Sequence, residues 1–270
     1  NAKMQHFLAQ SLPLIHQPET AVQGGTATGT TVAVLDTGVD YTRTAFGSCS
    51  TPGGSCKVVY AQDFAPDDYV LDDGEYHGTN VAGIVLGVAP NTRIAALDVF
   101  NGNSAYDTDT IAAINWAIAN KTGYNIVAMN LSLGRSRYYS LCASDVFATP
   151  IANAKAAGIL AAIASGNDAY KNSISSPACV PAAVSVGAVY DSNIGGPWSW
   201  SACTDYTTQA DQITCFSNSA SFLTLLAPGA LITAADITMG GTSQATPHVA
   251  GAIAVLRAAY PNVSLDATVE

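Results

Sequence analysis

Short runs of β-branched and other apolar residues alternate along the chain with longer segments of helical periodicity. The runs that read as buried strands are residues 31–36, 93–99, 125–131, 158–164 and 184–188. Nearly continuous apolar strands are typical of a parallel sheet that is covered on both faces. The pattern therefore predicts an α/β fold: a doubly wound, mostly parallel open sheet with helices on both faces.

The segments between the strands carry the signals of helices. Residues 107–120 place isoleucines at helical spacing after an Asp/Thr cap. A second helix should end at Gly158, and Pro150 either begins it or bends it. Residues 243–260 are apolar on all sides, which predicts a buried central helix.

Polar side chains stand where these strands and turns end. Asp36 closes the first strand, His77 opens a His-Gly turn into an apolar helix, and Asn167 follows the fourth strand. Ser243 lies at a glycine-rich turn that leads into the helix at 243–260. Open α/β sheets bind ligands at the carboxyl ends of their strands, so these four side chains are predicted to gather at one site.

The four residue types fit the chemistry of acyl transfer. Ser243 would be the nucleophile, His77 the general base and then the acid, and Asp36 the carboxylate that orients the imidazole. Asn167 and the unpaired amides of a helix start would donate hydrogen bonds to the oxyanion. Each residue alone also has a structural explanation as a helix cap or turn residue, so the hypothesis depends on their joint occurrence.

Composition narrows the class of protein. A chain of 270 residues with 49% hydrophobic residues can bury a large core, and we expect a single catalytic domain over residues 1–270. No apolar run reaches the roughly 20 residues that cross a bilayer. The net charge of −10 provides no basic surface for phosphates. We therefore expect a soluble monomer that binds neither nucleic acid nor membranes.

Six cysteines without a CxxC pair favour disulfides over zinc, and hence a secreted protein in an oxidising compartment. Reduced structural cysteines are the alternative, and the sequence alone leaves many pairings open. No charged and then apolar segment opens the chain, so a targeting segment is expected to be absent or already removed. We favour the sequential pairing, in which each bridge closes a local loop: Cys49 with Cys56, Cys142 with Cys179, and Cys203 with Cys215.

Three motifs carry a family resemblance. VAVLDTGVD, HGTNVAGI and GTSQATPHVAG place Asp36, His77 and Ser243 in the order found in the subtilisin-like serine proteases, or subtilases. NLSLG, ASGN and LAPG match further family segments, and the similarity extends from about residue 31 to residue 260. The resemblance implies a secreted serine endopeptidase with these three residues as its catalytic triad and Asn167 as its oxyanion donor.

The resemblance also implies how a protein or peptide substrate binds. It would add as a strand between two short segments and place a bulky apolar side chain in a small-walled pocket, with Asp168 at the rim to admit some basic residues. The family implies an N-terminal propeptide, and no cofactor for the chemistry. The residues implied in substrate binding are Ser132, Leu133, Gly134, Ser104, Ala105, Tyr106, Ala164, Ser165 and Gly166.

The chain departs from the family pattern beside its catalytic residues. Tyr76 precedes His77 where Gly is usual, Asn80 replaces a second His, and Gln244 follows Ser243 in place of Met. None of these changes removes a member of the triad. The chain also ends soon after the nucleophile helix, where the family continues for several dozen residues, so we expect a processed, truncated or minimal form.

The sequence leaves open whether the protein binds a structural calcium ion. The insertion that forms the first calcium site of many subtilisins has no room between HGTNVAGI and GVAP. Acidic residues crowd the loop before His77, and such oxygen ligands suit calcium, but a solvated acidic loop is the favoured interpretation because EF-hand spacing is lacking. The acidic residues of this loop are Asp63, Asp67, Asp68, Asp72, Asp73 and Glu75.

The chain lacks the sequence motifs of three other enzyme classes. An α/β-hydrolase esterase needs Ser, Asp and His in that order, but His248 precedes Asp266 after Ser243. A dinucleotide-binding dehydrogenase needs GxGxxG after its first strand, and a metalloprotease needs paired ligands such as HExxH; the chain has neither. The remaining rival is a catalytically inactive subtilase fold that serves as a binding or structural module.

Overall fold

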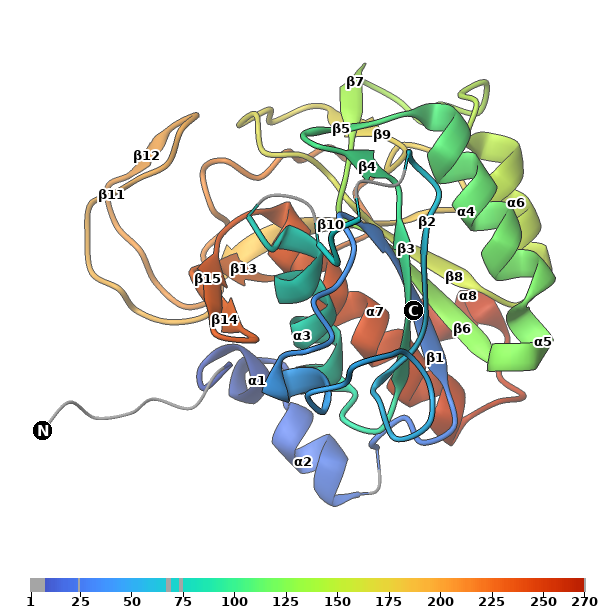
Figure 1. Cartoon of the computed structure of the whole chain (residues 1–270). Helices are drawn as coiled ribbons and strands as arrows, with labels where there is room; N and C mark the ends of the chain where they lie inside the picture. Colours follow the sequence, from blue (N-terminus) through green and yellow to red (C-terminus); the bar gives the residue numbers. More distant parts are fainter. Residues whose placement is uncertain (1–7, 24, 67–68, 73–74, 270) are drawn as a thin grey trace, which may run out of the picture.

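The computed structural model describes residues 8–23, 25–66, 69–72 and 75–269. The centre of this part is a parallel seven-stranded sheet in the order β13-β10-β8-β6-β1-β3-β2 (Figure 1). These strands are β1 (Thr31–Asp36), β2 (Val58–Asp63), β3 (Arg93–Asp98), β6 (Ile126–Leu131), β8 (Leu160–Ala164), β10 (Val184–Tyr190) and β13 (Leu225–Ala230).

The predicted fold class is confirmed, and the inner strands β1, β3, β6, β8 and β10 correspond to the predicted apolar runs. The two edge strands were not predicted. Strand β2 mixes apolar with polar residues, and most of its side chains are partly or fully exposed. Strand β13 contains Pro228 and Gly229, which normally argue against a strand. Both escape a search for continuous apolar runs.

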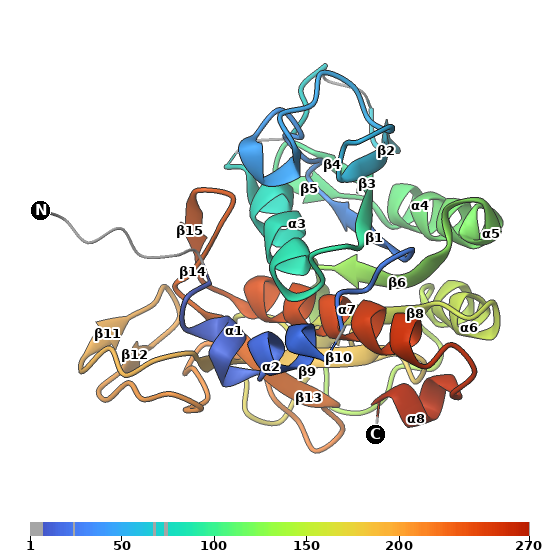
Figure 2. The same ribbon diagram turned by 90° about the horizontal axis from the view of Figure 1, so that it is seen from below.

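Helices cover the sheet on both faces. Val32 and Val34 of β1 pack in one core cluster with α3 (His77–Val88) and α7 (Thr242–Ala259). Ala33 and Leu35 pack in the other cluster with α4 (Asp107–Ala119) and α6 (Ala148–Ala156). Figure 2 shows α4 and α6 on the side of the strands opposite α3. The alternation along β1 therefore divides one strand between two cores.

The predicted helices are present with small shifts at their ends. The helix predicted at 107–120 is α4 (Asp107–Ala119), and α6 (Ala148–Ala156) stops before Gly158. Pro150 lies in the first turn of α6, so it begins this helix instead of bending it. Short helices are α1 (Ser11–Leu14), α2 (Gln17–Val22), α5 (Lys121–Tyr124), α8 (Leu265–Val269) and the 3-10 turn Thr44–Phe46.

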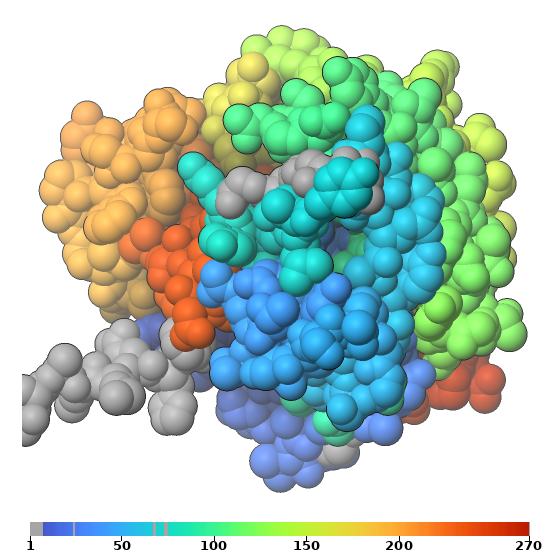
Figure 3. Space-filling view, in the orientation of Figure 1, coloured from blue at the N-terminus to red at the C-terminus, as the bar shows by residue number. Residues whose placement is uncertain are grey.

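In the described residues, eight short strands form four antiparallel two-stranded sheets outside the central sheet. Figure 3 shows one of them, β11–β12, in an orange bulge apart from the green segments that include α4. The pairs are β4 (Phe100–Asn101) with β5 (Ser104–Ala105), β7 (Arg135–Tyr138) with β9 (Ile174–Ser176), β11 (Trp198–Ser199) with β12 (Thr204–Asp205), and β14 (Ile232–Ala234) with β15 (Ile237–Met239).

The cysteines form three disulfides in the sequential pairs that the sequence favoured. Cα–Cα distances are 5.8, 5.4 and 6.1 Å for the bridges that begin at Cys49, Cys142 and Cys203. Such bridges are typical of proteins from oxidising compartments. Among the helices of the described residues, none combines the length and apolar character that a membrane crossing needs.

Candidate active site

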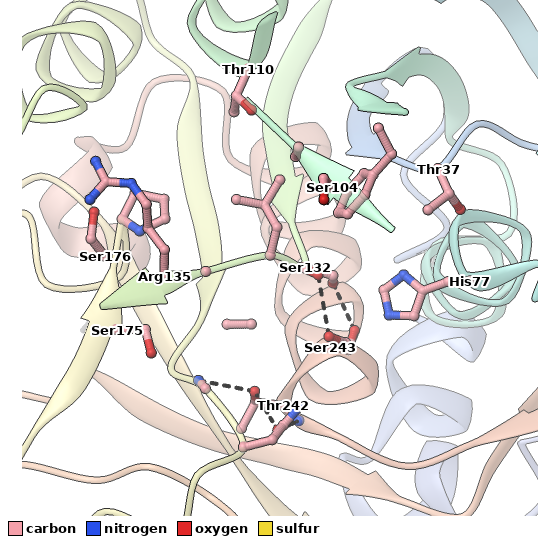
Figure 4. Close-up of a pocket in the computed structure, with 18 of the residues that line it drawn as sticks. Thr37, His77, Ser104, Thr110, Ser132, Arg135, Ser175, Ser176, Thr242 and Ser243 are labelled. Carbon is pink, nitrogen blue, oxygen red and sulfur yellow. Dashed lines mark hydrogen bonds between the residues drawn. The ribbon is translucent and has the colours of Figure 1, made fainter. Parts of the chain in front are cut away.

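A cleft of about 650 Å³ opens at the carboxyl ends of β1, β6 and β8 (Figure 4). The strand order places β3 on one side of β1 and β6 on the other, so the chain changes its direction across the sheet at β1. This is the point at which open α/β sheets bind their ligands. His77, Asn167 and Ser243 all line the cleft.

A short hydrogen bond joins His77 to the buried Asp36. The Nδ1–H of His77 donates to Oδ1 of Asp36 over 2.6 Å, and the backbone N–H of Thr37 donates to the same oxygen over 2.9 Å. Burial lowers the pKa of His77, but the charge and hydrogen bond of Asp36 outweigh this effect and raise the pKa above its ordinary value. The contact leaves Nε2 of His77 as the basic nitrogen.

Backbone geometry brings these two residues together. A Cβ on Gly78 would collide with the carbonyl oxygen of Gly38, so only glycine allows the start of α3 to approach the end of β1. Tyr76, before His77, adopts the left-handed conformation with φ of 59°, which explains why Gly is usual there. The Arg43 guanidinium lies 4.5 Å from the centre of the Tyr76 ring and packs over this turn.

Ser243 is the second residue of α7 and contacts the end of β6. Its Oγ donates to the carbonyl oxygen of Ser132 over 3.3 Å, and Oγ of Ser132 donates to the carbonyl oxygen of Ser243 over 2.8 Å. Within the described residues, no hydrogen bond joins Ser243 to His77. Catalytic hydrogen bonds often tighten only when substrate binds, and the side chains of His77 and Ser243 face the same part of the cleft (Figure 4).

Asn167 is fixed by the first residue of α7. Its Oδ1 accepts hydrogen bonds from the backbone N–H of Thr242 over 2.8 Å and from the Thr242 hydroxyl over 2.9 Å. In the described part of the chain, neither Nδ2 of Asn167 nor the N–H of Ser243 has a hydrogen-bond partner. Two donors are thus available beside the Ser243 hydroxyl, at the positive end of a helix.

The loop that carries Asn167 depends on a buried residue that sequence reasoning missed. Oδ1 of Asn218 accepts from the backbone N–H groups of Asp168 and Tyr170, each over 3.0 Å, and its Nδ2 donates to the carboxylate of Asp168 over 3.0 Å. Asn218 is fully buried. These contacts hold the turn around Asn167, and no sequence motif signals them.

Two of the departures from the family pattern touch each other. Nε2 of Gln244 donates to Oδ1 of Asn80 over 3.1 Å, and Nδ2 of Asn80 donates to the carbonyl oxygen of Ile237 over 2.9 Å. Both side chains are buried, and they join α3 to α7. The pair therefore connects the helix that begins with His77 to the helix that carries Ser243.

Most residues implied in substrate binding line the cleft, with two exceptions. Ser165 is fully buried, and its hydroxyl donates to the carbonyl oxygen of Asn218 over 2.8 Å, so it supports the wall from behind. Tyr106 is 61% exposed at the start of α4 and lies outside the cleft. The lining residues that the sequence did not predict include Thr110, Arg135, Phe147, Ser176 and Pro177.

Asp72 is a second buried carboxyl group close to the site. Its Oδ1 accepts from the Thr37 hydroxyl over 2.7 Å, and its Oδ2 accepts from both the backbone N–H and the hydroxyl of Thr79. Burial raises the pKa of Asp72 to about 7, since the hydrogen bonds from Thr79 and Thr37 offset only part of the desolvation and Asp36 adds repulsion. Asp72 thus joins the turn after β1 to the first turn of α3, which begins with His77, and its burial disfavours the ionised carboxylate.

We expect the contribution of Asp72 to the stability of the protein to fall as the pH rises from about 4 to about 7, whereas buried His248, whose pKa burial lowers to about 4, contributes the opposite trend up to about pH 6.5. Over this range Asp72 ionises in the unfolded chain but stays protonated in the folded protein, which costs about 1.4 kcal/mol for each pH unit. Asp72→Asn removes the Asp72 contribution, so the slope of unfolding free energy against pH should become more positive than in wild type, as measured by urea unfolding at several pH values. Asp266→Asn, at an exposed carboxyl, is the control, and an unchanged slope in Asp72→Asn would contradict the prediction.

The acidic loop before His77 is only partly described. Asp67, Asp68 and Asp73 lie outside the described residues, and Asp72 directs both of its oxygens toward Thr37 and Thr79. Within the described residues, no group of three or more His, Cys, Asp or Glu side chains is placed to hold a metal ion.

Comparison with known proteins identifies the family. The Subtilase family pattern matches residues 27–270. Subtilisin E of Bacillus subtilis (strain 168) is 34% identical over 95% of this chain and 64% of its own length. Subtilisin of Bacillus pumilus is 33% identical over 94% of this chain and 87% of its own length. The chain belongs to the subtilase family.

A solved structure supports the same assignment. A crystal structure of a cold adapted subtilisin-like serine proteinase superposes with a TM-score of 0.70 and 28% sequence identity, over 90% of this chain and 81% of that chain. The present chain spans only about two thirds of subtilisin E, at 64% of its length. Subtilases as a class need no cofactor for their chemistry.

Proposed function

We propose that this protein is a secreted serine endopeptidase that hydrolyses peptide bonds through an acyl-enzyme on Ser243. The observation that carries the proposal is the 2.6 Å hydrogen bond from His77 to buried Asp36, in the same cleft as Ser243 at the start of α7. Family membership and the three disulfides support it. A serine-directed fluorophosphonate tests it, because the hydroxyl of an activated serine attacks its phosphorus, displaces fluoride and leaves a stable phosphonyl ester on the enzyme.

The proposed mechanism follows from the tautomer of His77. Its Nε2 takes the proton of the Ser243 hydroxyl as Oγ attacks the substrate carbonyl, and the resulting imidazolium is stabilised by Asp36. The imidazolium then gives its proton to the leaving amine, which departs and leaves the acyl group on Ser243. Water, deprotonated by His77, releases the acid product in the second half of the cycle.

Two donors would stabilise the oxyanion of each tetrahedral intermediate. Nδ2 of Asn167 and the backbone N–H of Ser243 are both without partners in the described residues. Because Thr242 fixes the opposite end of the Asn167 amide, its donor end needs no reorganisation during the reaction. The helix start adds favourable dipole alignment.

We propose a broad specificity with a preference for a bulky apolar residue before the scissile bond. Ser132, Leu133 and Gly134 would pair with the extended substrate, and β5 would flank its other side. The pocket beside them has small walls formed by Ala164, Gly166 and Ser175. We also propose that the enzyme is monomeric and is made with an N-terminal propeptide, as the family implies.

The alternative function is that of an inactive subtilase fold that binds a partner. In that case the triad residues and the oxyanion donors would not catalyse hydrolysis. The His77–Asp36 hydrogen bond and the fixed Asn167 amide favour a catalytic site instead. The alternative predicts that no covalent adduct forms on Ser243.

We expect the peptidase activity to withstand mild peroxide. The residue after Ser243 is Gln244, which lacks the oxidisable thioether that the family usually places there. Activity should persist while Met239, whose Sδ lies 3.8 Å from Nε2 of Gln244, becomes oxidised. Activity assays and mass spectrometry check this, with the double variant Asn80→His/Gln244→Met as the sensitive control, because it leaves neither partner of the Asn80–Gln244 hydrogen bond unpaired. Rapid inactivation without any change at cysteine would count against the prediction.

A further inference from the structure

One end of the cleft holds a charged pair that the proposed chemistry does not use. Nε of Arg135 donates to Oδ1 of Asp107 over 2.8 Å, and Nη2 donates to Oδ2 over 2.9 Å. Both residues line the cleft, and their side chains are 40% and 41% exposed. Figure 4 shows Arg135 on the side of Ser132 that faces away from His77. The pair therefore lies at a distance from the reacting atoms.

This pair bridges the two walls between which substrate is proposed to lie. Asp107 begins α4, two residues after β5 ends, and Arg135 begins β7 directly after Gly134. A strand rises about 3.3 Å per residue. If the residue before the scissile bond lies beside Ser132, the third residue before the bond lies beside Gly134, and the fourth reaches Arg135 and Asp107.

The charges at this end of the cleft do not cancel. Nη2 of Arg135 also lies 3.6 Å from Oδ2 of Asp145, whose side chain is 2% exposed. Two carboxylates thus surround one guanidinium, which leaves an excess of negative charge. Glu75 and Asp168, which line the rest of the cleft, add to this negative field.

The shape of the same end suits a long amphipathic side chain. Leu133 and Phe147 line it, and the guanidinium carbon of Arg135 lies 5.7 Å from the centre of the Phe147 ring. A lysine or arginine of the substrate would lay its aliphatic stem along this apolar wall and bring its cation to the exposed carboxylate of Asp107. A glutamate would meet the same carboxylate with repulsion.

We infer that Asp107, held by Arg135, makes this subtilase selective for a basic side chain at the fourth residue before the scissile bond. The inference rests on the proposed peptidase function. It assigns Asp107 and Arg135 a role in specificity, since they lie away from the reacting atoms.

Peptides that differ only at that fourth position provide the test. With a constant apolar residue before the scissile bond, kcat/KM should be about 3- to 10-fold higher for arginine than for glutamate at low salt, because the exchange replaces a partly exposed attraction with a repulsion of similar size. The ratio should shrink in about 0.5 M salt, where surface charges are screened.

Variants separate this local effect from the general negative charge of the protein. Asp107→Asn leaves the charges of Arg135 and Asp145 balanced, so the ratio should fall to about one or below. Asp109→Asn makes the same change two residues along α4, outside the cleft lining, and should keep most of the preference. An equal fall in both variants would overturn the assignment to Asp107.

The outcomes also separate this inference from the proposed function. Equal rates for the arginine and glutamate peptides, or a faster glutamate peptide, would overturn the specificity while leaving the peptidase intact. Cleavage of neither peptide, together with no fluorophosphonate adduct on Ser243, would overturn both.

Discussion

Ser243→Ala should lower kcat by roughly 10⁶-fold, because it removes the atom that becomes acylated. A residual acceleration of roughly 10³ over water should persist, since Asn167 and the backbone N–H of residue 243 still stabilise the oxyanion. His77→Ala should lose a similar amount, and combining the two should cost little more, as the two residues act in one step. Peptide hydrolysis with purified variants measures these rates.

Labelling provides the matched control for that loss. Wild type should form one fluorophosphonate adduct, which mass spectrometry places on Ser243, and Ser243→Ala should form none. A Ser132→Ala variant keeps the nucleophile and should still be labelled, although it loses the hydroxyl that donates to the Ser243 carbonyl over 2.8 Å. A wild type that neither reacts at Ser243 nor cleaves peptides would favour the inactive binding module.

Asn167→Ala should lower kcat by about 10² to 10³ and leave KM within a few-fold. The reason is that one of two oxyanion donors disappears while the substrate-binding walls stay in place. Steady-state kinetics on one peptide over a range of concentrations separate kcat from KM.

A Thr242→Val variant separates the role of Asn167 as an oxyanion donor from the contacts that hold its amide in place. It removes the hydroxyl that contacts Oδ1 of Asn167 over 2.9 Å but keeps the Thr242 N–H that holds the amide over 2.8 Å. We expect a loss of less than about tenfold from this variant. If Asn167→Ala costs no more than Thr242→Val, the donor role of Asn167 is wrong.

The inner strands of the sheet could be predicted from the sequence because each one is a short apolar run that can be recognised within its own segment. Strands β1 and β6 are wholly buried runs whose apolar character needs no knowledge of their neighbours. The candidate residues Asp36 and His77 could be proposed together because Asp36 ends a strand, His77 opens a helix, and the strand ends and adjoining turns of an open α/β sheet lie at one edge. The structure adds the 2.6 Å contact between them, which no spacing in the sequence specifies.

The remaining features depend on contacts between distant parts of the chain. The support that Asn218 gives to the Asn167 loop spans about 50 residues, and the Arg135–Asp107 pair joins a strand to a helix that precedes it. Neither residue type is unusual in its own segment. Ser165 was expected beside the substrate, but its buried side chain points away from the cleft and donates to the carbonyl oxygen of Asn218, a contact with a distant segment that the sequence does not specify.

The contact between Asn80 and Gln244 couples the effects of substitutions at these two positions on stability. Restoring histidine at position 80 alone would leave the Nε2 of Gln244 to find another acceptor in a buried space, and restoring methionine at position 244 alone would strand the Oδ1 of Asn80. Each single reversion is therefore expected to be poorly tolerated, and the double reversion better than either.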